Sequence, residues 1–398
     1  MSQTAPPPVS SPRLGLPPNI KVLGLASLLN DIASEMIFPL LPAFLLNDLL
    51  GSRFQLGVIE GVADSVASFL KLWSGGRSDQ AGRRKGFVVF GYSLPALGRP
   101  LLALVVAPWQ LFVLRIADRV GKGVRASPRD ALIAESTGSS IRGRAFGFHR
   151  AMDHLGAAIG PLLAAGFLYF WPGQLRTVFL ITLVPGLLVV GLLIFGLRET
   201  PAQGPPKERL RLTLAPFDRN FRRYLLALAV FTLGNSSDAF LLVRAGELGV
   251  PTVMLPLLWC AFHVVKSLGN LFLGRAVDRF APRVFLNLGW LVHAGIYLAF
   301  GVATAAWQAW ACFLGHGLFY GLTEPSEKTL VVSLVGAERK GLAYGWYNFA
   351  IGIATLPASL IFGAIYQGFG ALAAFAWGAG LALVAFALLM TVREAPAR

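Results

Sequence analysis

Two acidic residues, Asp31 and Glu35, lie four positions apart in an otherwise apolar stretch near the N-terminus, LASLLNDIASEMIFPLLPAFLL. Residues i and i+4 share one face of a helix, so a helix here places both carboxyl groups within one turn. In surroundings of low dielectric, two like charges at that distance disfavour joint ionisation, which favours a shared or exchangeable proton. The spacing therefore predicts a proton-coupling site, with Asn30 beside it.

Further ionisable residues interrupt the apolar stretches. Each charge at the centre of a membrane helix costs about 2.5–3.5 kcal/mol on insertion scales, so such residues indicate partners or function. Glu60 and Asp64 form a second i,i+4 acidic pair, and Asp238 follows Asn235-Ser236-Ser237 in the second half of the chain. We expect these acids to line a proton-coupling and substrate cavity together with six other ionisable residues of apolar stretches: Arg99, Arg115, Arg119, Arg150, Asp153 and Lys266.

Other chemistries have little support in the sequence. His149 and His154 are i,i+5 and point from diverging faces of a helix, so a metal site is not expected. A phosphate-binding loop and a nucleophile–base arrangement are not legible, so we expect neither a cofactor nor an enzyme. Cys260 and Cys312 lie in apolar stretches and are interpreted as packing residues.

The composition is that of a membrane protein. The 398 residues are 55% hydrophobic and only 14% charged, with a mean hydropathy of +0.62. Val178–Leu197 holds no charge, and at 1.5 Å per residue it is long enough to cross about 30 Å of hydrocarbon. Because such blocks recur along the chain, we predict an all-α polytopic membrane protein.

Twelve spans are expected, with boundaries read from the apolar blocks. They cover residues 20–47, 54–74, 86–107, 109–134, 144–171, 176–197, 222–246, 251–274, 283–304, 306–333, 341–369 and 371–391. Several contain Gly and Pro, which membrane helices tolerate because neighbouring helices satisfy the freed backbone groups.

The basic residues alternate between loops, which predicts an orientation. The loops between spans 2–3, 4–5, 6–7, 8–9 and 10–11 are rich in Arg and Lys, whereas the opposite loops hold little more than Arg53 and Arg176. The positive-inside rule therefore places both termini in the cytoplasm. On a surface that binds nucleic acid, the basic residues would not alternate by loop. We therefore interpret the net charge of +15 as that of basic loops which orient the protein in a lipid bilayer.

The chain divides into two similar halves. We expect a disordered cytoplasmic tail (1–19), a six-helix bundle (20–198), a cytoplasmic linker (199–221), a second six-helix bundle (222–391) and a short cytoplasmic tail (392–398). Gly75, Asp79 and Arg84 recur as Gly274, Asp278 and Arg283, and two further matches share nearly the same offset. Such duplication is typical of transporters whose halves rock about a central site, with spans 1, 4, 7 and 10 expected to line it.

The loop between spans 2 and 3, GGRSDQAGRRK (Gly75–Lys85), resembles the corresponding signature of the major facilitator superfamily. This resemblance implies the major facilitator fold of twelve helices in two pseudo-symmetric bundles. We expect two cytoplasmic gate clusters whose charges pair when that side closes. The first comprises Gly75, Asp79, Arg83, Arg84 and Asp130, and the second comprises Asp278, Arg283 and Glu327.

A helix-packing motif narrows the resemblance. Gly156, Gly160 and Pro161 form a Gly-x-x-x-Gly-Pro segment similar to that of the twelve-span drug/metabolite proton antiporters, and Arg119–Gly123 resembles their fourth-span motif. The resemblance implies proton-coupled efflux of a small molecule across a cell inner membrane by a monomeric protein. The cations of spans 3, 4, 5 and 8 leave uptake of a polar or anionic metabolite with protons as the alternative. A non-transporting receptor or an enzyme is a more distant one.

Overall fold

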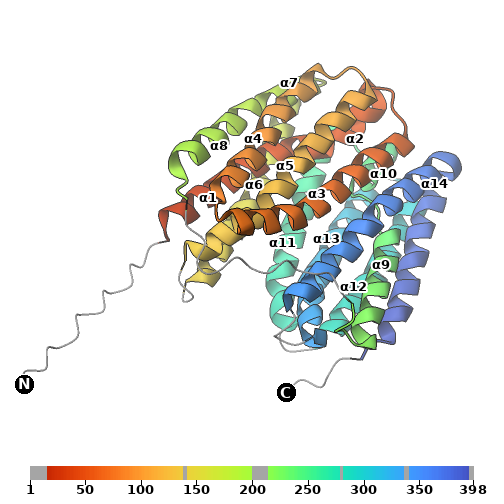
Figure 1. Cartoon of the computed structure of the whole chain (residues 1–398). Helices are drawn as coiled ribbons and strands as arrows, with labels where there is room; N and C mark the ends of the chain where they lie inside the picture. Colours follow the sequence, from red (N-terminus) through yellow and green to blue (C-terminus); the bar gives the residue numbers. More distant parts are fainter. Residues whose placement is uncertain (1–15, 138–140, 200–213, 278–280, 336–339, 394–398) are drawn as a thin grey trace, which may run out of the picture.

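The computed structural model describes residues 16–137, 141–199, 214–277, 281–335 and 340–393, and the regular structure of this part of the chain is helical (Figure 1). In the first half, α1 (Pro18–Ile37) continues through η1 (Phe38–Leu40), α2 (Leu41–Ala43) and η2 (Phe44–Asp48). It is followed by α3 (Arg53–Ala81), α4 (Lys85–Leu101), η3 (Leu102–Leu104), α5 (Pro108–Glu135), α6 (Arg142–Phe170), α7 (Leu175–Ile181) and α8 (Leu183–Gly196).

The second half begins with α9 (Arg219–Gly234) and α10 (Ala239–Glu247). These are followed by η4 (Thr252–Met254), α11 (Leu255–Val277), α12 (Pro282–Val302), α13 (Ala306–Val335) and α14 (Lys340–Met390). At Gly370, φ is 83° and ψ is 179°, so the chain turns there and α14 is two helices. Glycine occupies this turn because a positive φ carries a steric cost for other residues.

Each expected span therefore has a helical counterpart among the described residues. By length and apolarity, eight helical segments qualify as membrane spans, one of them the segment Leu342–Met390 that holds two helices. The helices α3, α5 and α13 are not among those eight. Both α3 and α5 carry several of the charged residues singled out in the sequence, which lowers their hydropathy. That α3, α5 and α13 cross the membrane stays a prediction.

The helices form two bundles with corresponding internal contacts (Figure 1). In the first half, α1 packs on α6, and α5 packs on both α3 and α4. In the second half, α9 packs on α14, and α13 packs on both α11 and α12. The contacts between the halves correspond as well, because α3 packs on α14 and α6 packs on α11. The repeat seen in the sequence is thus present in the packing.

The bundles share one end at which the chain enters and leaves. Asn19 at the start of α1 hydrogen-bonds to Arg198 after α8, and Asn220 at the start of α9 accepts from the backbone of Arg393 after α14. We call this the terminal end. The expected tail 1–19 and linker 199–221 fall largely outside the described residues, and α1 begins at Pro18, slightly earlier than expected.

The first span of each half is broken near its middle. After Ile37, the prolines Pro39 and Pro42 introduce a short 3₁₀ segment, since proline lacks the amide hydrogen that an α-helix needs. Between α9 and α10 the break falls at Asn235–Ser237, whose polar side chains compete for backbone hydrogen bonds. Both breaks lie where the halves meet, since η1 packs on α10 and α11 and the side chains of Asn235–Ser237 line the cavity between the halves.

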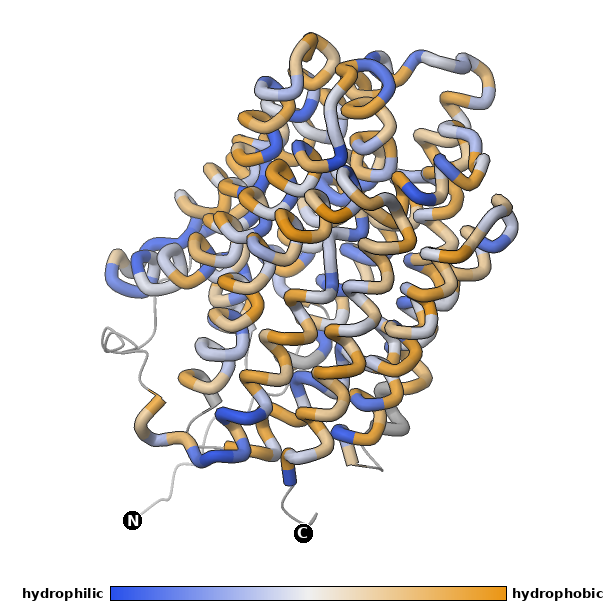
Figure 2. The backbone as a smooth tube through the Cα atoms, turned by 90° about the vertical axis from the view of Figure 1, so that its right-hand side faces the viewer, coloured by the Kyte–Doolittle hydropathy of each residue, from blue (hydrophilic) through white to orange (hydrophobic). Residues whose placement is uncertain are grey.

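The outer surface is strongly apolar. Side chains such as Phe195 and Phe369 are 89% and 81% exposed, as suits contact with lipid. Figure 2 shows apolar residues along most of each helix, with hydrophilic residues gathered mainly near the helix ends.

Candidate functional site

A cavity of about 780 Å³ lies between the two bundles. Its walls come from α1, η1, α3, α5 and α6 of the first half, and from α9, the α9–α10 break, α11, α13 and α14 of the second. Spans 1, 4, 7 and 10 contribute, as the repeat predicts, and spans 2, 5, 8 and 11 form the rest of the wall. Seven of the residues predicted for the cavity line it: Glu35, Glu60, Asp64, Arg119, Arg150, Asp238 and Lys266. Glu327, predicted for the second gate cluster, lines it as well.

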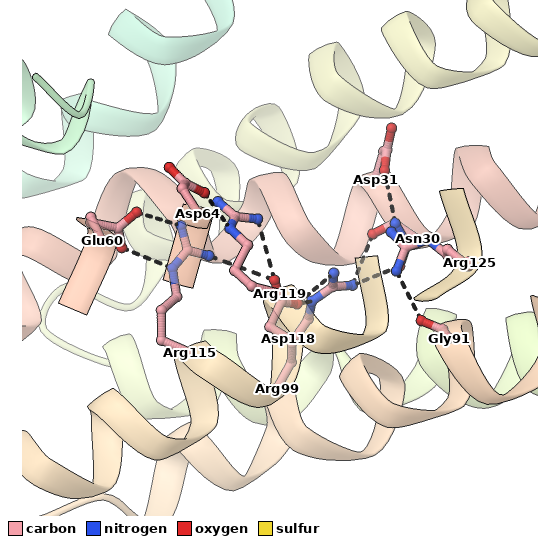
Figure 3. Close-up of polar contacts among 10 residues, drawn as sticks. All are labelled: Asn30, Asp31, Glu60, Asp64, Gly91, Arg99, Arg115, Asp118, Arg119 and Arg125. Atoms are coloured by element: carbon pink, nitrogen blue, oxygen red, sulfur yellow. Dashed lines mark hydrogen bonds and ion pairs between the residues drawn. The ribbon is translucent and has the colours of Figure 1, made fainter. Parts of the chain in front are cut away.

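A bidentate ion pair joins α5 to α3 beside this cavity (Figure 3). Arg115 donates from Nε and Nη2 to the two carboxylate oxygens of Glu60, both at 2.8 Å. The two side chains are only 5% and 3% exposed. Charges this deeply buried are tolerated because they are paired and hydrogen-bonded.

Two more arginines extend the network through Asp118 (Figure 3). Arg99 of α4 donates to Asp118 at 2.9 Å and also to the backbone and side-chain oxygens of Asn30, at 3.0 and 3.1 Å. Arg119 lies 2.9 Å from Asp64 and 3.4 Å from Asp118. Asn30, Arg99 and Arg115 are therefore components of the bundle interior behind the cavity wall.

Glu35 has a different environment from these paired acids. Trp259 of α11 donates its indole N–H to Glu35 at 2.7 Å, and His263 lies 3.9 Å from the same oxygen. Phe38 packs against Trp259 with ring centroids 4.9 Å apart. The hydrogen bond crosses from one half to the other, so Glu35 sits where the halves meet. Asp31 instead accepts from Asn30 at 2.8 Å and lies outside the cavity lining.

The second half supplies four further polar contacts to the cavity. Asp238 lies 3.0 Å from His316 Nε2 and 3.4 Å from the hydroxyl of Tyr320. Lys266 forms an ion pair with Glu324 at 2.7 Å. Glu327 accepts from the hydroxyl of Tyr347 at 2.5 Å.

The expected first gate cluster is arranged differently in part. Arg84 lies 2.7 Å from Asp79, as the loop signature predicts, but its second carboxylate partner is Glu135. Asp130 instead pairs with its neighbour Arg129 at 2.8 Å. Glu135 is the last residue of α5 and lies about one and a half turns beyond Asp130. This position brings Glu135 to Arg84, the residue just before α4.

The remaining gate residues lie as follows. A Cβ on Gly75 would lie 3.2 Å from Ser127, so α3 and α5 approach closely there, while Arg83 is exposed. In the second cluster, Asp278 lies outside the described residues. Arg283 donates to the backbone oxygen of Val392, and Glu327 faces the cavity. The role of either cluster as a gate stays a prediction.

The helix-packing motif brings α1 and α6 into backbone contact. A Cβ on Gly156 would lie 2.6 Å from the Leu28 carbonyl, and one on Gly160 would lie 2.5 Å from that of Ile32. Pro161, the next residue, lies inside α6. Asp153 lies on the same contact and is hydrogen-bonded by Ser27.

Several contributors to the site were missed from the sequence. Asp118 could have been predicted from the sequence, because an acidic residue between Arg115 and Arg119 in an apolar stretch needs charged partners. His316 carried a similar signal, as a histidine in an apolar stretch, whereas Trp259 and Tyr320 carried none, since a tryptophan or tyrosine in a membrane helix is ordinary. The missed residues are Asp118, Glu135, Trp259, His316, Tyr320 and Glu324.

Two duplicated helical bundles with a polar cavity between them are the arrangement of a secondary transporter. The family model described as the Major Facilitator Superfamily matches residues 23–356 and, in a second match, 238–398. The chain belongs to the Major Facilitator Superfamily. It is accordingly a multi-pass membrane transporter and not an enzyme.

Relatives agree with this assignment. The chain is 29% identical over 380 residues to an uncharacterised MFS-type transporter of Methanocaldococcus jannaschii, with 94% of each chain covered. It is 27% identical over 338 residues to the multidrug resistance protein MdtH of Proteus mirabilis, which covers 78% of this chain and 80% of that protein.

Solved structures share the fold. A bacterial homologue of the human lysosomal transporter Spinster, in an inward-facing and occupied conformation, has a TM-score of 0.75 at 16% identity and covers 95% of this chain and 98% of that one. The nucleoside transporter NupG has a TM-score of 0.81 at 12% identity and covers 94% and 100%.

Proposed function

We propose that this transporter exports a cationic, partly apolar organic solute in exchange for protons. The orientation that the basic loops predict places the terminal end in the cytoplasm of a cell whose inner membrane holds the protein. The protein acts as a monomer, because the cavity is complete within one chain.

The observation that supports this proposal is how the charged residues around the cavity are paired. Arg99, Arg115, Arg119 and Lys266 each have a carboxylate partner within 3 Å. Glu35 instead contacts an indole N–H and a histidine of the second half. A carboxylate beside aromatic rings suits a cationic solute, since ring faces attract cations as well. The same carboxylate can hold a proton when the solute is absent.

This charge distribution weakens the alternative of anion uptake. That alternative depended on cations of spans 3, 4, 5 and 8 being free to bind an anion. Arg99, Arg115, Arg119 and Lys266 are already neutralised by acids of the same half, which leaves Lys122 and Arg150 as the other cations of those spans that line the cavity.

The cavity geometry supports loading from the terminal end. At the far end, α10 packs on α2, and Arg53 lies 2.5 Å from Glu247 across the halves. The lining extends in the other direction to Arg150, Lys328 and Tyr347, which lie in the terminal parts of their helices. A cavity closed at the far end takes up solute from the cytoplasm, and the similarity to a multidrug resistance protein also favours efflux.

The test is transport by purified protein in proteoliposomes with an imposed pH gradient, with tetraphenylphosphonium as the first probe. Wild-type protein should accumulate the cation against its gradient. Glu35→Gln and Asp31→Asn should abolish this accumulation and largely retain exchange of labelled for unlabelled cation at equal pH. The reason is that exchange needs no proton. Concentrative transport with wild-type pH dependence in both variants would overturn the coupling role of the pair.

A further inference from the structure

The contact between α1 and α6 holds a line of titratable side chains that the cavity does not use. We propose that Asp31, Asp153 and His149 form a proton route along this contact, connecting Glu35 with the terminal end of the bundle. The proposal rests on the proposed proton coupling at Glu35 and adds the path by which the proton leaves.

The register of the two helices places these groups on one line. On α1, Ser27, Asp31 and Glu35 follow one another at four-residue intervals and so share a face. On α6, a Cβ at Gly160 would lie 3.2 Å from that of Glu35, and one at Gly156 would lie 2.9 Å from that of Asp31. The two glycines therefore leave room for the two carboxyl groups between the helices.

The next step toward the terminal end is a direct hydrogen bond. The Ser27 hydroxyl donates to Asp153 Oδ1, one turn along α1 from Asp31. Four residues of helix span about 6 Å, a gap short enough for one ordered water to bridge. A hydroxyl both donates and accepts, so Ser27 can pass a proton as well as hold the carboxylate.

His149 completes the route. Its Nδ1 lies 3.5 Å from Asp153 Oδ2, one turn nearer the start of α6. The residue is 2% exposed, and its Nε2 is buried with no hydrogen-bond partner among the described residues. A buried, unsatisfied polar atom costs about 1–3 kcal/mol. An imidazole that accepts a proton at one nitrogen and releases it at the other has a use for that free nitrogen.

The neighbouring charges come from both helices and from α5. On α6, Arg150 lies 3.9 Å from Asp153 and is 64% exposed. On α5, Arg125 and Arg129 act electrostatically on Asp31 and Asp153, respectively. The acids of the route thus face cations as well as one another.

A proton route outside the cavity allows the proton to leave while the solute occupies the cavity. When a bulky cation occupies the cavity against Glu35, it displaces the water through which the proton would otherwise leave. The α1–α6 contact lets the proton depart while the cation stays, which is the order of events that exchange requires.

The experiment separates the amount of proton released from its rate. Full-length protein in detergent and weak buffer is mixed rapidly with tetraphenylphosphonium, and a pH indicator follows proton release. His149→Gln and Asp153→Asn should release as many protons as wild type. Their release should be about 10²-fold slower, the low end of what a positioned proton-transfer group contributes. Asp153→Glu, which keeps a carboxyl group, should recover part of the rate.

His293→Gln is the matched control, since His293 is also fully buried with no partner for either ring nitrogen in the described chain. It should release protons at the wild-type rate. Ser27→Ala replaces Asp153→Asn if the latter fails to fold. Wild-type rates in His149→Gln and the Asp153 or Ser27 variant would overturn the route and leave the coupling at Glu35 standing. Absence of any release from wild-type protein that binds the cation would overturn both.

Discussion

Arg115 and Glu60 show how much a single buried charge depends on its partner. Replacing Arg115 by Met leaves the Glu60 carboxylate without its bidentate donor, which should lower the free energy of unfolding by about 3–5 kcal/mol. Arg115→Met/Glu60→Gln should be more stable than Arg115→Met alone. Thermal unfolding of the purified protein in detergent measures both.

The control for this pair is Arg150→Met, because the Arg150 side chain is 64% exposed. Its unfolding temperature should stay close to that of wild type. Equal stability of Arg115→Met and the double variant would contradict the assigned partnership.

At this scale the sequence predicted which charged side chains lie in the helical interior better than which residues they contact. A charged residue in an apolar stretch is recognisable from the sequence, so Glu60, Arg99 and Arg115 were predicted as interior residues. Helical periodicity tells which residues share a face but not which neighbour that face meets. The contact of Glu35 with Trp259 joins residues 224 positions apart in different halves, and its geometry depends on how the bundles dock.

The helices themselves were more predictable, because the length of an apolar block is a local property. Each expected span has a helical counterpart, and the repeat predicted corresponding contacts between helices. The breaks after α1 and between α9 and α10 were not predicted. Proline and clustered polar residues occur in many unbroken membrane helices, so whether a helix breaks at them depends on its neighbours.

The glycines of α6 allow a test at the scale of the helix pair. Gly160→Val would push against the Ile32 carbonyl, which a Cβ at Gly160 would approach to 2.5 Å. Overpacking of this kind costs about 1–3 kcal/mol and should lower the unfolding temperature and the transport rate together.

Gly166→Ala is the matched control in the same helix, since nothing lies within 4 Å of a Cβ there. It should keep or raise stability, because alanine favours a helix over glycine by about 1 kcal/mol. Equal stability of Gly160→Val and wild type would mean that α1 and α6 are not held in close contact.

For the whole molecule, the contact between Arg53 and Glu247 holds the halves together at the far end. Tyr366 also donates to Glu247 at 2.7 Å. Because the pair is partly exposed, its loss should cost about 0.5–1 kcal/mol, a shift of roughly two- to fivefold toward the state with the cavity closed to the terminal end. Glu247→Gln should accordingly lower the rate at which a cysteine introduced at Ser34 in the cavity reacts with a polar maleimide.

Arg222→Ala is the comparison variant, since Arg222 donates to Leu214 within one half. Its labelling rate should match that of the protein with the Ser34 cysteine alone. An unchanged rate in Glu247→Gln would show that the Arg53 contact does not hold this conformation.

The arginine network of the first half also has an electrical consequence. Arg99, Arg115 and Arg119 are matched by Glu60, Asp64 and Asp118, so this interior cluster carries no net charge. Moving one elementary charge across the membrane potential changes the free energy by about 2.3 kcal/mol per 100 mV, but a neutral cluster contributes nothing to that work. Movement of this cluster when the halves rock therefore does almost no work against the membrane potential. If one monovalent cation leaves for each proton that enters, the whole cycle is electroneutral, and export continues in a depolarised cell as long as a pH difference remains.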